Sequence, residues 1–170
     1  MRVLLITGLA GSGKTTLARR LARRYNTLLL SKDDIKEPLL EVLGASDAAH
    51  SRLLSTASFA VLFAIARRHL LAGIDLILEG NFRPGEHEKP LESLPKARIV
   101  QVLCRVGDAA RLARLAGRER HAGHGDADPA VRADRTGDAF LELPGERLTF
   151  DGEITDSGGV ALIDRCWHGL

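Results

Sequence analysis

The segment from Gly8 to Thr15 reads GLAGSGKT and constrains the fold more than any other part of the chain. It matches the pattern GxxxxGK(S/T), follows an apolar run of strand length, and opens a segment of helical periodicity. Such a loop holds β- and γ-phosphates with backbone N–H groups that point into one concavity, and glycines keep that space free of side chains. A glycine-rich turn with a chance Lys-Thr pair is the alternative, and the flanking strand and helix argue against it. The residues predicted to bind the nucleotide are Gly8, Ala10, Gly11, Ser12, Gly13, Lys14, Thr15 and Thr16.

Two side chains of this loop have predicted chemical roles. Lys14 supplies a positive charge to the phosphates and is expected to be catalytic, because charge develops there during phosphoryl transfer. Thr15 offers a hydroxyl oxygen to Mg²⁺. The positive end of the helix dipole also faces the bound anion.

Apolar runs of strand length alternate with segments of helical periodicity along the chain. This alternation is typical of an α/β fold, with a parallel sheet covered by helices on both faces. A length of 170 residues with 45% apolar content suits one domain, residues 1–170, around a single core. The predicted strands are Val3–Thr7, Thr27–Leu30, Ile74–Leu78, Arg98–Leu103 and Leu148–Phe150, and the predicted helices are Lys14–Tyr25, about Asp47–Ala72, Ala109–Ala116 and Val160–Trp167.

The charge balance excludes a global attraction to nucleic acid or to an anionic membrane, because the formal net charge is only +2. Two cysteines, Cys104 and Cys166, form neither a disulfide framework nor a metal set, so both are interpreted as reduced and buried. The longest unbroken apolar run, Phe59–Ala66, is shorter than the roughly 20 residues of a membrane helix. We therefore expect a cytoplasmic protein with no membrane partner.

The chain contains no NKxD guanine-reading box, which argues against a signalling GTPase. A ring-forming or helicase ATPase needs additional elements that 170 residues do not provide. The small phosphotransferases are the class for which this length suffices.

The second predicted strand is followed by Ser31-Lys32-Asp33-Asp34-Ile35-Lys36. Ligands gather at the carboxyl ends of parallel strands, so two carboxylates lie on the same edge as the phosphate loop. A hydroxyl that attacks a γ-phosphoryl group needs a carboxylate to orient it and accept its proton, and Asp33 is the predicted base. Lys36, on the same predicted helix face, is expected to contact the acceptor. The alternative is that Ser31 and Asp33 only cap a helix near Asp34, with Asp34 the more typical cap residue.

The third predicted strand leads into Glu79-Gly80-Asn81-Phe82-Arg83. A carboxylate at this place holds Mg²⁺ through water or positions the acceptor, so Glu79 is predicted to serve metal and substrate. A solvated strand-end glutamate is the alternative. Asn81 and Arg83 are predicted to face the acceptor pocket.

The segment after the fourth predicted strand is rich in arginine, and an arginine that closes over the transferred phosphoryl group stabilises its charge. We expect a lid over about residues 107–137. Arg114 and Arg118 are the predicted catalytic arginines, Arg118 and Arg120 are expected to bind nucleotide, and a solvated helix face explains Arg111. His121 and His124 lack further ligands for zinc, and their role in the lid stays open.

The chain resembles the small bacterial P-loop kinases of the AAA family, a group similar to polynucleotide 5′-hydroxyl kinase domains, chloramphenicol phosphotransferase and the zeta toxins. The resemblance rests on GLAGSGKTT, SKDDIKEPL, LEGNFRPGEH and GRERHAGHGD, which begin at Gly8, Ser31, Leu78 and Gly117. It implies five parallel strands in the order 2-3-1-4-5, an Arg-rich lid, ATP or GTP as donor with Mg²⁺, and Asp33 as base. Lys36 stands where the polynucleotide kinases carry arginine, and Ala122 replaces a common proline of the lid.

The leading functional prediction is a kinase that transfers the γ-phosphoryl group of a nucleoside triphosphate to a hydroxyl of a small molecule. A kinase for 5′-hydroxyl ends of nucleic acid is the nearest alternative, although aromatic residues for stacking bases make up only 4% of the chain. A non-catalytic nucleotide-binding module is an alternative of another class. The sequence assigns neither the acceptor nor an oligomeric state, and the loop 151–157 is expected to approach the nucleobase.

Overall fold

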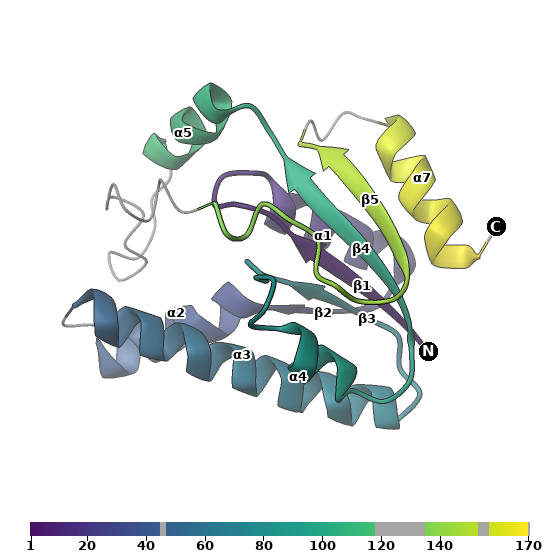
Figure 1. Cartoon of the computed structure of the whole chain (residues 1–170), viewed down its shortest axis with the longest axis horizontal. Coiled ribbons are helices and arrows are strands. Elements are labelled where there is room, and N and C mark those ends of the chain that lie inside the picture. Colours follow the sequence, from purple (N-terminus) through teal and green to yellow (C-terminus); the bar gives the residue numbers. More distant parts are fainter. Residues whose placement is uncertain (45–46, 118–134, 153–156, 170) are drawn as a thin grey trace.

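The computed structural model of the chain describes residues 1–44, 47–117, 135–152 and 157–169. Its centre is a five-stranded, fully parallel sheet in the order β2-β3-β1-β4-β5 (Figure 1). This order confirms the topology implied by the family resemblance. The strands are β1 (Arg2–Thr7), β2 (Leu28–Ser31), β3 (Leu76–Glu79), β4 (Arg98–Arg105) and β5 (Glu146–Asp151).

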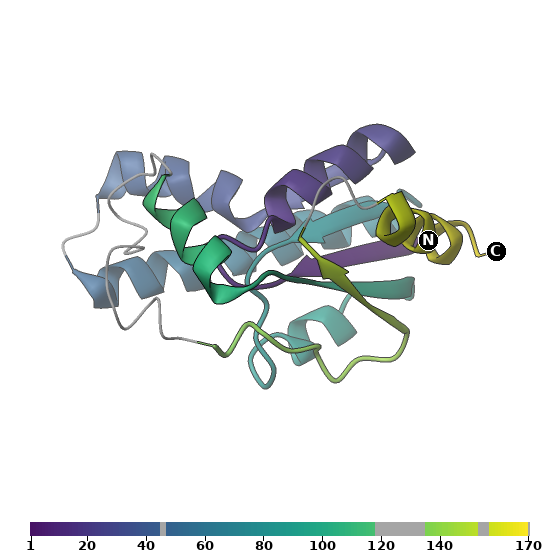
Figure 2. The ribbon, with the colours of Figure 1, turned by 90° about the horizontal axis from the view of Figure 1, so that it is seen from above.

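The two faces of the sheet carry separate apolar clusters because side chains alternate along each strand. Leu4 and Ile6 of β1 point to the face that is covered by α1 (Lys14–Tyr25) and α7 (Ser157–His168). Val3 and Leu5 point to the other face, which is covered by α3 (Ala48–Leu71) and α4 (Glu88–Glu92). Figure 2 shows α1 and α4 on opposite sides of the sheet. The predicted helix layers on both faces are therefore confirmed.

The helices agree with the sequence pattern where the apolar spacing is regular and differ where it is interrupted. Helix α1 has the predicted bounds, α3 is within one residue of them, and α5 (Asp108–Ala116) begins one residue early. Helix α2 (Lys32–Leu43) continues through Pro38, and the five-residue α4 was not predicted. Helix α7 begins three residues before the predicted start. The predicted start is late because the first turn contains two glycines, which have poor helix propensity.

The lengths of the strands place polar residues at the carboxyl edge of the sheet. Ser31 pairs in register with Glu79, and Ile6 lies beside Glu79 on the other side. The strand ends predicted at Leu30 and Leu78 therefore fall one residue short, because both polar residues still belong to the ladder. In Figure 1 the carboxyl edge lies at the left and both chain termini lie at the right.

Helix α3 is long and apolar enough, with a mean hydropathy of 1.3, to meet the length and composition criteria for a membrane span. One of its faces nevertheless packs on the sheet through Phe59, Leu62, Ala66 and Leu70. This packing is typical of a core helix of an α/β domain.

Candidate active site

The loop between β1 and α1 has the open backbone that phosphate binding requires. Gly8, Gly11 and Gly13 all have positive φ, and Gly13 is the N-cap residue of α1. At Gly11, with φ +84°, a Cβ atom would lie 2.8 Å from the carbonyl oxygen of Arg111 and 3.2 Å from Leu115 Cγ. A side chain at this position would therefore push the root of α5 away from the loop.

Unpartnered polar groups face the space that this loop encloses. The first N–H groups of α1 have no acceptor within the helix, and no side chain caps it. Ser12 is 1% exposed, and its hydroxyl has no hydrogen-bond partner among the described residues. A buried polar atom without a partner destabilises the free protein, so these groups fit an anion such as a polyphosphate.

Glu79 is at the centre of a small polar cluster beside the loop. Its carboxylate is 1% exposed, accepts a 2.6 Å hydrogen bond from the Ser31 hydroxyl, and accepts a 3.3 Å bond from the Thr15 hydroxyl. Lys14 Nζ lies 3.9 Å from Glu79 Oε1, and the Lys14 side chain is 7% exposed. The interpretation of Glu79 as a solvated strand-end residue is therefore wrong. Hydroxyl and carboxylate oxygens are ligands that suit Mg²⁺, directly or through water, so Thr15 and Glu79 fit the predicted metal role.

The first turn of α2 corrects the capping alternative. Helix α2 begins at Lys32, and its N-cap residue Ser31 makes no side-chain capping bond because its hydroxyl binds Glu79. Asp34 is inside the helix, where it forms an exposed 3.5 Å ion pair with Arg19. Asp33 is mostly buried, and its carboxylate lies 3.0 Å from Lys32 Nζ. The N-cap residue is Ser31, so neither aspartate occupies the cap position.

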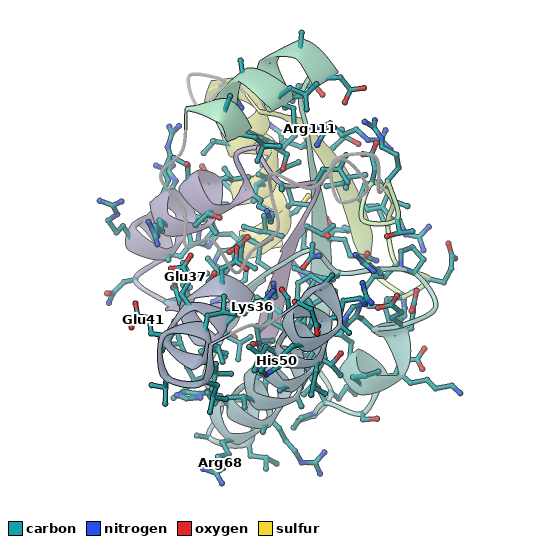
Figure 3. The ribbon with its side chains drawn as sticks, turned by 90° about the vertical axis from the view of Figure 1, so that its left-hand side faces the viewer. Lys36, Glu37, Glu41, His50, Arg68 and Arg111 are labelled. Carbon is teal, nitrogen blue, oxygen red and sulfur yellow. The ribbon has the colours of Figure 1, made fainter. Side chains whose placement is uncertain are left out.

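Lys36 is 4% exposed, although it carries a charge, and its Nζ donates a 2.9 Å hydrogen bond to the Ser51 hydroxyl of α3. In Figure 3, where the carboxyl edge faces the viewer, Lys36 lies near the centre and Glu37 and Glu41 lie toward the margin. A lysine held in this way connects α2 with α3 on the acceptor side of the edge.

Two arginines of α5 lie at the phosphate loop. The Arg111 side chain is 7% exposed and packs its Cγ and carbonyl against Gly11, so the prediction that Arg111 belongs to a solvated helix face is wrong. Arg114 donates bonds of 3.3 and 3.4 Å to the Gly152 carbonyl, and its Nη1 lies 3.6 Å from where a Cβ of Gly13 would be. Figure 3 shows Arg111 on the α5 side of this edge. Arg118, Arg120, His121 and His124 lie outside the described residues.

A cluster of charges joins the two described ends of the predicted lid. Asp108 accepts hydrogen bonds from Arg135 at 2.6 Å and from Arg111 at 3.2 Å, and Asp138 accepts bonds from Arg105 and Arg135. The bonds from Arg135 and then Arg111 hold the pKa of Asp108 below its usual value of 3.8. The start of α5 and residues 135–138 are thus fixed to each other at the end of β4.

The loop after β3 borders a cavity of about 540 Å³ that lies against α3. Asn81 and Arg83, both predicted to face an acceptor, line this cavity. Its apolar wall contains Phe59, Phe63 and His87, which the sequence analysis did not identify. Phe59 and Phe63 lie on α3, 20 and 16 residues before Glu79, so only the packing of α3 brings them to the site.

Cys104 lies behind the phosphate loop and confirms its predicted burial. Burial raises the pKa of its thiol to about 12, so the thiol stays neutral and unreactive. Cys166 is half-buried, which is less than predicted. Among the described residues, no group of three or more His, Cys, Asp and Glu side chains could hold a metal ion.

The strand order 2-3-1-4-5, the glycine loop after β1 and the buried Lys14 define a P-loop protein. The chain belongs to the AAA domain family, whose model matches residues 3–139. It matches none of the curated proteins with which it was compared.

Solved structures agree with this assignment. A "putative kinase" from Chloroflexus aurantiacus shares 30% identity, with 99% of this chain and 98% of that chain covered and a TM-score of 0.86. A sugar kinase from Janibacter sp. shares 18% identity over 99% and 95% of the two chains, with a TM-score of 0.65. The APS kinase CysC of Mycobacterium tuberculosis, solved with AMPPNP and APS, shares 20% identity over 96% and 95%, with a TM-score of 0.59. The last two similarities show the fold alone, and the family and fold together place the chain among the small P-loop kinases.

Proposed function

We propose that this protein transfers the γ-phosphoryl group of ATP or GTP, with Mg²⁺, to a hydroxyl group of a small molecule. The observation that carries the proposal is the buried Glu79 carboxylate, held between Thr15, Ser31 and Lys14 beside the open glycine loop. A protein that only bound nucleotide would not need buried charges on the acceptor side of the loop, where Lys36 and Asp33 lie.

Different residues of the site would bind the phosphates, hold the metal ion and accept the proton of the acceptor. The loop amides, Ser12 and Lys14 hold the β- and γ-phosphates, while Thr15 and Glu79 would hold Mg²⁺ directly and through water. The bound metal would neutralise charge on the phosphates. Asp33 takes the proton of the acceptor hydroxyl as its oxygen bonds to the γ-phosphorus, and the bond from that phosphorus to the bridging oxygen breaks to release the nucleoside diphosphate.

The α5 arginines support the same reaction. Arg114 lies between the phosphate loop and Gly152, where its guanidinium group is close to the space for the nucleotide. Arg111 adds a buried positive charge behind Gly11. Charge-stabilising roles for Arg114 and Arg118, and nucleotide binding by Arg118 and Arg120, remain predictions.

The cavity beside Asn81 favours a small acceptor over the end of a nucleic acid. Its volume of about 540 Å³ lies in the range of pockets that enclose small ligands. A polynucleotide acceptor would also need an extended basic channel, and the formal net charge of the whole chain is only +2.

The test compares Asp33→Asn with Asp34→Asn, two neighbouring and isosteric changes of the same charge. We expect Asp33→Asn to lower turnover by about 10²–10⁴-fold and to leave AMPPNP affinity nearly unchanged. Asp34→Asn should leave both unchanged, because within the described part of the chain Asp34 pairs only with exposed Arg19. Phosphotransfer is measured with ATP and GTP against nucleosides, sugars, aminoglycosides and a 5′-hydroxyl oligonucleotide. Equal loss in both variants contradicts the role of Asp33, and preferential use of the oligonucleotide contradicts the small-molecule acceptor.

A further inference from the structure

The cavity beside Asn81 has a composition that restricts its ligand. This inference rests on the proposed function, because it treats the cavity as the acceptor site of the kinase. The cavity lies between the side of α3 and the loop that follows β3, and it extends from Asn81 to Pro90 at α4.

One wall of the cavity is continuous with the carboxyl edge of the sheet. Phe59 lines the cavity, and its ring lies directly against Gly80, where a Cβ atom would be 3.3 Å from Phe59 Cε1. The same Cβ would lie 3.2 Å from Lys32 Cβ. Gly80 follows Glu79 in the chain, and Lys32 precedes Asp33, so this wall adjoins the two backbone segments that carry the carboxylates.

The walls of the cavity offer ring surfaces. The ring of Phe59 lies 4.1 Å from that of His87 and 6.0 Å from that of Phe63, measured between centroids. Phe82, which is fully buried, supports the Phe59 ring from behind at 5.3 Å. Flat ligands gain stacking energy on such surfaces, whereas flexible chains lose more entropy on binding.

His87 adds one oriented donor to these walls. Its Nδ1 accepts a 2.9 Å bond from the Arg83 backbone N–H and lies 3.3 Å from the Arg83 carbonyl oxygen. The shorter contact favours the tautomer that carries its proton on Nε2. No partner for Nε2 lies among the described residues. Burial holds the pKa of His87 below its usual value of 6.5, which keeps the ring neutral at physiological pH.

The described charges of the lining add to one positive charge. Arg52 and Arg83 contribute two guanidinium groups, and Glu86 contributes one carboxylate. Arg83 pairs with Glu86 at 3.7 Å, whereas Arg52 has no ion-pair partner among the described residues. The outer part of the cavity is thus complementary to one negative charge.

We propose that the acceptor is an alcohol built on a flat ring that carries one anionic group. In this arrangement the ring packs against Phe63 and the small accessible part of Phe59, His87 Nε2 donates to a ligand oxygen, the anionic group faces Arg52, and the hydroxyl lies toward Asn81.

Four probes separate the two requirements. The ring acid is 4-(hydroxymethyl)benzoate and its neutral analogue is 4-(hydroxymethyl)benzamide, while 6-hydroxyhexanoate and 1,6-hexanediol are the open-chain acid and its neutral counterpart. Dissociation constants are measured with the full chain by ligand-observed NMR. We expect the ring acid to bind about tenfold more tightly than the open-chain acid and about fivefold more tightly than its amide. Equal affinity for the two acids overturns the ring requirement, equal affinity for acid and amide overturns the charge requirement, and failure of all four probes to bind overturns the whole proposal.

A matched pair of variants tests the location. Ala60→Trp places a large ring in the mouth of the cavity, and Ala64→Trp places it one turn further along α3, on an exposed residue that does not line the cavity. We expect Ala60→Trp to weaken binding of the ring acid at least tenfold and Ala64→Trp to leave it unchanged, with similar melting temperatures. Equal effects of the two variants overturn the assignment of the site.

A second measurement separates this proposal from the proposed function. AMPPNP binding is measured for the unmodified chain and for Lys14→Ala. If AMPPNP fails to bind while the ring acid still binds in an Ala60-dependent manner, the kinase function is wrong and the cavity assignment stands. If AMPPNP binds through Lys14 while Ala60→Trp has no effect on the ring acid, the cavity assignment is wrong and the kinase function stands.

Discussion

At the amino edge of the sheet, arginines are exposed and pair with carboxylates at short distances. Arg2 binds Asp75 through its backbone N–H and Nε, both at 2.7 Å, and Arg24 binds both oxygens of Asp164 at 2.7 and 2.8 Å. At the carboxyl edge, two buried lysines have looser contacts, although Lys32 pairs with Asp33 at 3.0 Å and Arg135 pairs with Asp108 at 2.6 Å. Lys14 is 3.9 Å from Glu79, and the buried Lys36 donates to a serine hydroxyl.

The difference indicates that contacts at the amino edge mainly stabilise the fold, whereas the charges at the carboxyl edge mainly serve ligand binding. The buried Lys14 lies 3.9 Å from the Glu79 carboxylate, so it gives up hydration for an incomplete replacement, and this destabilises the fold. An exposed arginine fork on a carboxylate has no such penalty. The positive charge of Lys14 at the carboxyl edge is thus suited to a bound anion, whereas the arginines at the amino edge are neutralised by carboxylates of the chain itself.

The largest expected effect comes from Lys14→Ala at the carboxyl edge. Turnover should fall by about 10²–10³-fold, because a preorganised charge at the transferred phosphoryl group is lost. The melting temperature should change little, because removing the buried Lys14 charge and leaving the buried Glu79 carboxylate without that cation have opposite effects on stability. Steady-state kinetics and thermal unfolding measure the two effects, with exposed Lys96→Ala as control. A large loss of stability would contradict the separation of the two edges.

The converse change is Trp167→Ala at the amino edge. Trp167 is 2% exposed, stacks on Tyr25 at 5.0 Å, and lies under the Arg2 guanidinium group at 4.7 Å. Its removal should lower the free energy of unfolding by about 3–5 kcal/mol, measured by urea denaturation. Turnover at temperatures where the variant is folded should not change, and Trp167→Phe should restore much of the stability. A selective loss of turnover would show that the edges are coupled.

Glu79→Gln sharpens the comparison at the metal. If Glu79 holds Mg²⁺ through water, the Mg²⁺ concentration for half-maximal activity should rise about 10–100-fold. The exposed Glu92→Gln is the control. An unchanged Mg²⁺ dependence would assign Glu79 to positioning Ser31 and Thr15 alone.

The smallest effect is expected for Asp164→Asn, which should lower stability at pH 7 by about 1 kcal/mol. Burial raises the pKa of Asp164, but hydrogen bonds from Arg24 and Tyr25 outweigh it and hold the pKa below the usual 3.8. The contribution of Asp164 is therefore complete above pH 3.8 and is lost as the pH falls through the lower pKa of the folded state. Urea unfolding at pH 7 and pH 3 should show a smaller difference between variant and unmodified chain at pH 3. A difference independent of pH would contradict this origin.

Local sequence patterns predicted which segments form the site, whereas the contacts between their side chains depend on tertiary packing. The glycine loop, and the polar residues after β2 and β3, follow from motif spacing and from the rule that parallel strands present their carboxyl ends together. The burial of Arg111 could not be predicted, because it depends on the packing of α5 against Gly11. The Ser31 bond to Glu79 depends on the register of β2 with β3. Phe59 begins the longest apolar run of the sequence, and only its position against Gly80 makes it part of the site.

The contact between Gly11 and Arg111 restricts which substitutions the sequence can accept during evolution. The space that a side chain at position 11 would fill is taken by the backbone carbonyl of Arg111 and by Leu115. A larger residue at position 11 is therefore compatible with the fold only if α5 shifts at the same time. Substitutions on the side of α5 that faces away from Gly11 do not meet this restriction. Substitutions of Gly11 and of the α5 residues that contact it must occur together.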